Sequence, residues 1–365
     1  MTKARNLADL LNADGQIDNA DIADNTIANA KLAQTPNFRN IIINGDMSIA
    51  QRGTSESGIT GSTFGWFTVD RWRFGVDNLG TWTMSQDTDV PTGQGFASSL
   101  KLECTTANAS PSASDTLFLN QNFEGQMLQY LKKGTANAES LTLSFWVKSN
   151  KTGTYTISLD DNDNNRNIVG TYIINSSDTW EKKTLTFEGD TIGAFDNDNN
   201  SSLRFYFWLG AGSNLTSGTL ATSWENTVTA NLVSSSNVNL ADSTSNYINI
   251  TGVQLEAGTT ASDFEFLPYD MNLQRCLRYY QEPNYIFMYN MGIYNKYMVD
   301  ALNFPVVMRA SPTMSATFTT FSATVTDELV AARGPGGFYF YSYFTGGASA
   351  TSRNQASSIT ADAEL

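Results

Sequence analysis

Carboxylates and aromatic rings are the side chains most able to do chemistry here, because the sequence contains no histidine. The lack of histidine excludes Ser-His-Asp and Cys-His nucleophiles, His-ligated zinc and the easiest proton carrier near neutral pH. The chain has 36 acidic residues, so some pair of carboxylates will reach glycosidase spacing by chance. Such a pair alone does not indicate an enzyme. We therefore expect a non-catalytic protein.

The most suggestive acidic motif is Asp-Asn-Asp-Asn-Asn, which occurs at 161–165 and again at 196–200. An EF-hand calcium loop needs glycine at its sixth position and glutamate at its twelfth. The residues at those positions are Arg166 and Tyr172 in the first copy, and Ser201 and Phe207 in the second. We predict that both copies are solvated turns between strands, and we expect no metal ion and no cofactor.

Two predicted strands combine an apolar face with a face of polar aromatics. Because side chains alternate along a strand, one face is made of the apolar residues Leu141, Leu143, Phe145 and Val147 in the first strand, and Leu203, Phe205, Phe207 and Leu209 in the second. The opposite faces carry Trp146 in the first strand, and Tyr206 and Trp208 in the second. Rings with polar handles can stack on sugars, or they can be buried between subunits, and the sequence leaves both interpretations open.

A third aromatic strand is predicted at 337–344, near the end of the chain. Its Phe338, Phe340 and Phe344 share one face with Ser342, and Tyr339, Tyr341 and Tyr343 share the other. Each phenol buried without a hydrogen-bond partner would cost roughly 1–3 kcal/mol. This cost favours a tyrosine face that is exposed to solvent. We predict that these tyrosines bind a receptor or glycan. The alternative is packing against a neighbouring subunit.

Composition limits the class of protein. Hydrophobic residues make up 41% of the 365 residues and charged residues only 16%, so Asn, Ser, Thr and Gly must supply much of the surface. This composition is typical of all-β extracellular or virion proteins, and the length allows two or three domains. A net charge of −14 argues against nucleic-acid binding.

Cysteine usage and hydropathy indicate where the protein is assembled. Cys104 and Cys276 show no CxxC pairing, so we expect free, buried or half-buried thiols and assembly in a reducing cytoplasm. No apolar run approaches the ~20 residues of a membrane span, and the first residues do not resemble a signal peptide. We therefore expect no membrane insertion and release by cell lysis.

The first 36 residues have a pattern of their own, which predicts a short extended or helical attachment segment. One helical face is formed by Leu7, Leu10 and Leu11, and a five-residue apolar period by Ile17, Ile22, Ile27 and Leu32. A five-residue step forms no stripe on a helix and changes face on a strand. It suits chains wound about a common axis, and short repeats of this kind resemble the shafts and attachment segments of trimeric bacteriophage fibres. This resemblance implies a homotrimer. The alternative is a disordered polar leader.

Between this segment and residue 270, turn-punctuated strands predict a sandwich. We expect one long bent strand within the stretch 37–53, running from Ile41 to Ala50 with a bulge near Gly45, and a loop at 52–65. Further strands are expected near 66–73, 80–85, 98–105, 115–120, 140–149, 153–159, 167–175, 181–188, 202–210 and 246–256. A short helix is predicted at 121–133, with Phe123, Met127, Tyr130 and Leu131 on one face, and a long excursion at 213–245. A helix near 271–281 then leads into a second β-domain.

Four stretches carry a resemblance to a known family. They are NFRNIIINGDMSIAQRG from Asn37 to Gly53, Val69-Asp70-Arg71-Trp72, LTLSFWVKSN, and VQLEAGTTASDFE. Their order resembles the sandwich domain of bacteriophage tail-fibre and related virion proteins, which is itself similar to jelly-roll carbohydrate-binding modules. The resemblance covers roughly residues 37–270. Jelly rolls of that kind often hold a structural calcium near positions matching Asp46 and Glu256, although no ligand set is evident here.

The resemblance implies an all-β virion fibre protein: an attachment segment at 1–36, a jelly-roll β-sandwich at 37–270 and a smaller C-terminal β-sandwich at 271–365. It implies binding to a host-surface glycan or other receptor during adsorption, with many weak contacts adding up. The N-terminus would bind other virion proteins, and the protein would be assembled in the host cytoplasm. A purely structural head-fibre, collar or baseplate protein is the alternative. A polysaccharide depolymerase is a third interpretation, although no β-helical repeat is present.

Overall fold

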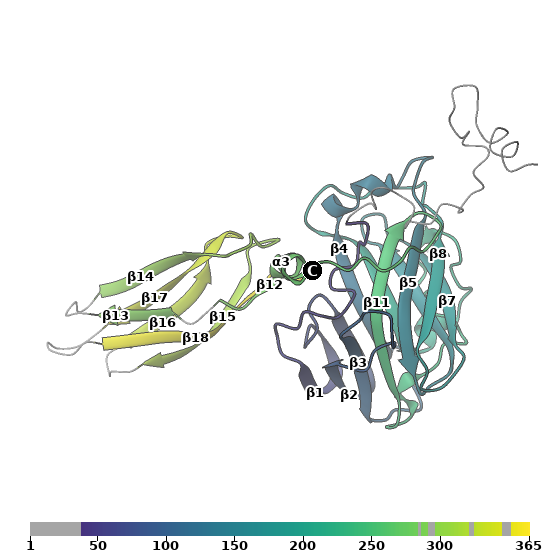
Figure 1. Cartoon of the computed structure of the whole chain (residues 1–365), viewed down its shortest axis with the longest axis horizontal. Helices are drawn as coiled ribbons and strands as arrows, with labels where there is room; N and C mark the ends of the chain where they lie inside the picture. The colour runs from purple at the N-terminus through teal and green to yellow at the C-terminus, as the bar shows by residue number, and fades with distance from the viewer. Residues whose placement is uncertain (1–37, 284–285, 291–295, 321–324, 345–351) are drawn as a thin grey trace, which may run out of the picture. The chain divides into compact units, whose positions relative to one another are not determined.

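The computed structural model describes residues 38–283, 286–290, 296–320, 325–344 and 352–365 (Figure 1). The chain divides into two compact units, Met1–Arg39 and Asn40–Leu365, and all of the described strands and helices belong to the second unit. The predicted attachment residues lie outside the described residues: Leu7, Leu10, Leu11, Ile17, Ile22, Ile27 and Leu32.

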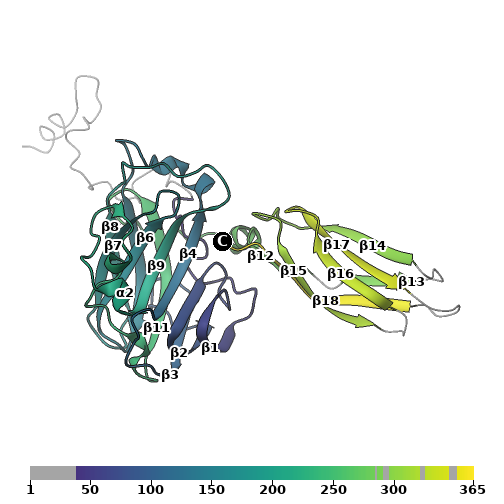
Figure 2. The same ribbon diagram turned by 180° about the vertical axis from the view of Figure 1, so that it is seen from behind.

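The first eleven strands form a jelly-roll sandwich (Figures 1 and 2). They are β1 (Ser55–Gly65), β2 (Arg73–Asp87), β3 (Ser99–Thr106), β4 (Thr116–Glu124), β5 (Leu141–Ser149), β6 (Gly153–Asp161), β7 (Arg166–Ile174), β8 (Glu181–Phe187), β9 (Ser201–Ala211), β10 (Glu225–Asn226) and β11 (Tyr247–Ala257). One layer has the order β10-β7-β6-β9-β4-β2, and the other has the order β2-β3-β11-β5-β8. The all-β prediction is confirmed.

Strand β2 belongs to both layers. Its first half, Arg73 to Asn78, pairs with β4, and its second half, Thr81 to Asp87, pairs with β3. Between the halves, Asn78 and Gly80 have φ angles of 54° and 82°, which bend the strand from one layer into the other. The strand predicted near 66–73 is wrong, because β2 begins only at Arg73, and the strand predicted near 80–85 is the second half of β2.

The core lies between the two layers. Phe145 of β5 packs edge-on against Phe207 of β9, with ring centroids 5.0 Å apart, and so joins one layer to the other. The predicted core faces are confirmed, since their members are all buried: Leu141, Leu143, Phe145, Val147, Leu203, Phe205, Phe207 and Leu209.

The opening stretch is not the long bent strand that the sequence predicts. Ile41 to Ile43 are buried, and the backbone runs beside β11 through bonds from Ile41 N to Leu255 O and from Val253 N to Gly45 O, both 2.9 Å. Asn44 interrupts any ladder because it has a φ of 60° and its side chain bonds both N and O of Ile49. Regular structure begins only at Ser55, inside the predicted loop.

The helix predicted at 121–133 is also wrong. Strand β4 continues to Glu124, and only two 3₁₀ turns follow, η3 (Gly125–Met127) and η4 (Gln129–Leu131). The strand persists because the buried Gln121 side chain bonds the backbone N and O of Ile43. Phe123 and Leu131 are buried, but Tyr130 is 48% exposed, so these residues do not share one apolar face.

The long excursion at 213–245 is confirmed. Its regular elements are short: α2 (Ser213–Thr216), β10, η5 (Thr229–Asn231) and η6 (Leu240–Asp242). The helix predicted near 271–281 is present as α3 (Tyr269–Leu277). Cys276 on α3 and Cys104 on β3 are both buried, free thiols, as the sequence predicts.

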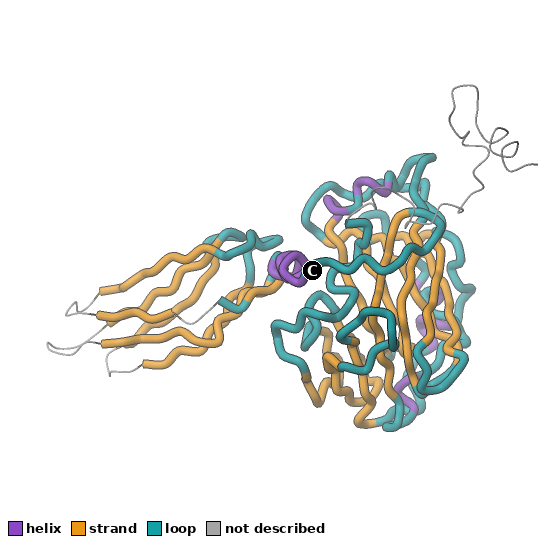
Figure 3. Tube along the Cα trace, in the orientation of Figure 1, coloured by secondary structure: helices purple, strands orange, loops and turns teal. Residues whose placement is uncertain are grey.

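The remaining strands form a smaller sandwich, drawn as the group of orange strands at the left of Figure 3. They are β12 (Tyr280–Gln281), β13 (Ile286–Asn290), β14 (Lys296–Asn303), β15 (Thr313–Thr320), β16 (Val325–Ala332), β17 (Gly337–Phe344) and β18 (Ser352–Asp362). In one sheet β18 lies between β15 and the pair β12 and β13, and the other sheet has the order β14-β17-β16. Phe318 of β15 stacks on Phe340 of β17 at 5.9 Å and joins the two sheets.

Candidate functional site

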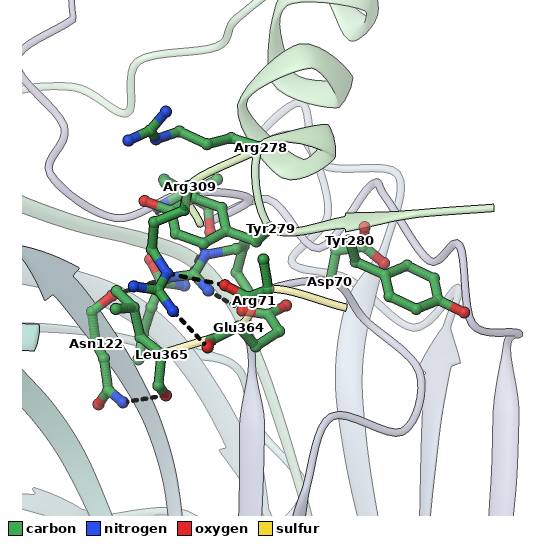
Figure 4. A network of polar contacts seen from close by, with 12 residues as sticks. Asp70, Arg71, Asn122, Arg278, Tyr279, Tyr280, Arg309, Glu364 and Leu365 are labelled. Atoms are coloured by element: carbon green, nitrogen blue, oxygen red, sulfur yellow. Dashed lines mark hydrogen bonds and ion pairs between the residues drawn. The ribbon is translucent and has the colours of Figure 1, made fainter. Parts of the chain in front are cut away.

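The charged residues of the opening motifs meet the end of the chain in a buried polar cluster, the C-terminal network (Figure 4). Arg71, which is 1% exposed, pairs with the buried carboxylate of Glu364 and donates to Asn122 O at 2.8 Å. Its guanidinium lies 3.4 Å from the centre of the Tyr279 ring. Burial raises the pKa of Glu364, and the nearby Arg71 and Arg52 guanidiniums oppose that rise.

A second ion pair anchors the segment that comes after α3. Glu124 accepts hydrogen bonds from Arg278 at 2.7 and 2.6 Å and from the Tyr279 hydroxyl at 2.6 Å. Burial pushes the pKa of Glu124 up, but these hydrogen bonds outweigh it, so the pKa lies below its ordinary value of 4.5. Arg309 donates to the backbone oxygens of Ala363 and Glu364 at 2.8 and 3.1 Å.

These contacts explain why the opening motifs contain charged residues. Asp70 accepts from the backbone and side chain of Gln51, and Arg52 stacks over Tyr280 while pairing with Asp362. Buried pairs of this kind hold chain segments together, and removing one partner is costly. The C-terminal network is therefore a set of structural contacts that joins the sandwich, α3 and the last residues of the chain. The sequence marks Arg52, Asp70 and Arg71 as motif residues but does not reveal the partners that they meet.

The aromatic face predicted on β9 is covered by the chain itself, so that prediction needs correction. Tyr206 and Trp208 stack at 5.3 Å but are only 8% and 5% exposed. Leu215 of α2 and Val233 pack over them, and Trp208 donates to Ser158 Oγ at 3.1 Å. Neither ring is open to a glycan or to a second subunit. The excursion at 213–245 supplies this cover, and strand periodicity carries no signal of it.

Trp146 lies on the other layer, away from Tyr206 and Trp208. It is half-buried on the outer face of β5 and lines a hollow of about 280 Å³ together with Phe96, Phe264 and Phe266. The structure therefore does not bring together the three aromatic residues that the sequence predicts as one class of site.

The third predicted aromatic surface is present on β17. Phe338, Phe340 and Ser342 are buried, at 2%, 0% and 0% exposure, whereas Tyr339, Tyr341 and Tyr343 are half-buried on the opposite face. The alternation is therefore confirmed for these six residues. The Tyr339 and Tyr341 rings stack with centroids 6.2 Å apart and planes 21° from parallel.

Strands β14 and β16 extend this surface on either side. In the strand register Tyr341 lies opposite Val299 of β14 and Leu329 of β16, which are 64% and 39% exposed. Tyr339 lies opposite Ala301, which is exposed, and Ala331. We call Tyr339, Tyr341, Tyr343, Val299 and Leu329 the tyrosine face. Sequence analysis missed Val299 and Leu329, because only the pairing of the strands reveals them.

The two Asp-Asn-Asp-Asn-Asn copies form turns that lie side by side. Asp163 Oδ2 accepts from Asp196 N at 2.9 Å, and Asn164 donates to Ala194 O at 2.9 Å. Asp46 bonds Ser48 and Asn272, and Glu256 bonds Gln254 and Ser262. Among the described residues, no three acidic, cysteine or histidine side chains gather closely enough to hold a metal ion. No helix in the described part of the chain is long and apolar enough to cross a membrane.

No protein-family model matches the chain, and no curated protein matches it. Among solved structures, it is similar to the enzymatically active domain of bacteriophage CBA120 tailspike protein 4, with 14% identity and a TM-score of 0.32 over 60% of this chain and 21% of that one. It is similar to the carbohydrate-binding module TmCBM61 in complex with β-1,4-galactotriose (10% identity, TM-score 0.30, 60% and 99% of the two chains).

A third similar structure is the family 11 carbohydrate-binding module of a Clostridium thermocellum cellulosomal cellulase. Its identity is 9% and its TM-score 0.28, over 56% of this chain and 98% of that module. Likenesses at this level do not indicate a shared function. The functional argument therefore rests on the surfaces described above.

Proposed function

We propose that this chain is a non-catalytic virion fibre protein that binds a host-surface glycan or other receptor through the tyrosine face. The observation that carries the proposal is the stacked, half-exposed pair Tyr339 and Tyr341, held on a strand whose other face is fixed in the core. A tyrosine presents a large, rigid contact area at low entropic cost, and its hydroxyl can bond a polar ligand.

Rigidity supports the proposal further. Phe338 stacks on Phe304 at 5.2 Å and Phe340 on Phe318 at 5.9 Å, so the inner side of β17 is locked by two ring pairs. A preorganised strand loses little freedom when a ligand binds. Several copies of a weak site on one particle would then give strong adsorption. Assembly with other virion proteins through the N-terminal segment belongs to the same proposal.

A purely structural virion role is the second candidate, and the exposure of Val299 and Leu329 favours it. Exposed aliphatic side chains beside tyrosines also suit contact between subunits, whose central residues are apolar and aromatic. In that case the tyrosine face would be buried in the assembled fibre.

The Tyr341→Ala substitution separates the two candidates. We expect particles carrying it to adsorb to host cells several-fold more weakly, while the oligomeric state and the melting temperature of the purified protein stay unchanged. Tyr269→Ala is the matched control, because Tyr269 is 64% exposed on α3 and lies outside the tyrosine face. Unchanged adsorption would contradict receptor binding at this face, and dissociation into monomers would support the structural role.

A further inference from the structure

The hollow around Trp146 is built by three strands and two loops of the sandwich, and β11 contributes Gly252 to it. β5 supplies Trp146 and Ser144, β8 supplies Lys182, and the segments before β3 and after β11 supply Phe96, Phe264 and Phe266. Trp146 lies directly opposite Lys182 in the strand register. The indole and the ammonium group therefore project from the same face of the sheet.

A bulge in β11 makes room for the aromatic wall. The register of β11 against β5 shifts between Thr251 and Gln254, and Gly252 there has a φ of 60°. A side chain at Gly252 would collide with the Phe96 ring. Glycine at this position thus allows the Phe96 ring to lie directly on the strand. Bulges are often found next to binding sites.

The three phenylalanines support one another. The ring centroids of Phe96 lie 5.1 Å from those of both Phe264 and Phe266, and Phe264 and Phe266 are 4.9 Å apart. Phe266 nevertheless remains 50% exposed. This cluster therefore forms a fixed wall with one open ring, beside the half-buried Trp146.

The polar lining of the hollow is mixed and balanced. Lys182 can donate hydrogen bonds, Asp263 can accept them, and Gln94 can do both. The positive charge of Lys182 and the negative charge of Asp263 cancel. The hollow therefore has no net charge that would select a charged ligand. Such a lining matches hydroxyl groups, which both donate and accept.

From these features we infer that the hollow is a carbohydrate-binding site for a neutral pyranose unit, separate from the tyrosine face. The apolar C–H face of the sugar ring would stack on Trp146 against the phenylalanine wall, and its hydroxyls would bond Lys182, Asp263 and Gln94. A volume of about 280 Å³ is at the small end of the ~300–1,000 Å³ usual for ligand pockets. The site therefore suits one or two sugar units, at the end of a glycan or along it.

Isothermal titration of the full chain tests this inference. The probes are neutral hexasaccharides of glucose, galactose, mannose and xylose, with oligogalacturonate as the charged counterpart. We expect at least one neutral probe to bind with a Kd in the millimolar range or below, and we expect the same Kd in 0.5 M NaCl. Binding by oligogalacturonate alone, or no binding by any neutral probe at 10 mM, would overturn the inference.

Variants locate the binding in the hollow. Trp146→Ala should weaken binding at least tenfold, and Phe266→Ser should weaken it several-fold without disturbing the core, since half of that ring is already in solvent. Ile192→Ser is the matched control, because Ile192 is 58% exposed and does not line the hollow. Tyr341→Ala should bind the probes like the wild type, so failure of the tyrosine-face proposal would leave this result intact. Binding that survives both hollow variants would place the sugar elsewhere and contradict the inference.

Discussion

At the scale of single residues, Glu124 is a carboxylate whose negative charge should stabilise the folded protein. It is buried, and it bonds both Arg278 and Tyr279. Its pKa in the folded protein lies below the ordinary value of 4.5. A carboxyl group of this kind adds stability that is complete above the unfolded-state pKa and is lost as the pH falls through the folded-state pKa.

We therefore predict that Glu124→Gln lowers the free energy of unfolding by about 2 kcal/mol at neutral pH, because a charged pair is lost but Arg278 remains partly in solvent. The difference from wild type should shrink as the pH falls below 4.5. Urea unfolding at several pH values measures both effects. A difference that stays constant down to pH 3 would show that the Glu124 charge contributes nothing.

Residue patterns predict which side of a strand is apolar, but not what covers its other side. Tyr206, Trp146 and Tyr341 occur in similar alternating contexts, yet only Tyr206 is fully covered. Its cover comes from α2 and Val233, which lie in a polar excursion with no periodicity. For the same reason sequence analysis does not single out Phe96 and Phe266, since their meeting with Trp146 depends on tertiary contacts.

At the scale of elements, the bend in β2 decides how the two layers connect. Gly80 has a φ of 82°, and a side chain there would collide with the carbonyl oxygen of Thr106. Gly58 in β1 has a φ of 74° but has nothing nearby. Comparing a substitution at Gly58 with one at Gly80 therefore separates the cost of backbone strain from the cost of a steric collision.

We predict that Gly58→Ala costs about 1 kcal/mol of stability, from its left-handed backbone alone. Gly80→Ala should cost at least twice as much, because Thr106 belongs to a paired strand and cannot move away freely. Chemical denaturation of the two variants side by side gives the comparison. Equal losses would mean that Thr106 moves aside and that no steric collision adds to the backbone strain at Gly80.

Most element positions follow from the sequence, and the exceptions share a cause. The strands from β3 to β11 are predicted to within a few residues, apart from the two-residue β10 inside the excursion. The predictions of a strand in the opening stretch and of a helix at 121–133 are wrong. Buried Asn44 and Gln121 side chains bond the backbone there and override local propensity. The C-terminal network is beyond sequence reasoning, since Arg71 and Glu364 are far apart in the chain.

At the scale of the whole molecule, the oligomeric state stays a prediction. The five-residue apolar period from Ile17 to Leu32 predicts a homotrimer, and these residues lie outside the described part of the chain. Mass photometry of the full chain should report three copies. A stable monomer at sub-micromolar concentration would contradict the trimer.

Deleting residues 1–34 should leave the melting transition of the remaining domains nearly unchanged but abolish loading onto particles. Misfolding of the shortened chain would show that these residues are part of the folded body.

The measurement that tests the central claim most directly is binding of fluorescently labelled full chain to intact host cells, before and after mild periodate oxidation. Periodate cleaves vicinal diols and so destroys many surface glycans while it leaves most protein receptors in place. Protease treatment of a parallel sample removes the protein receptors instead. Our account predicts saturable binding that periodate abolishes and protease spares. Binding that resists periodate but is lost after protease would contradict a glycan receptor, and no binding to untreated cells would contradict receptor binding altogether.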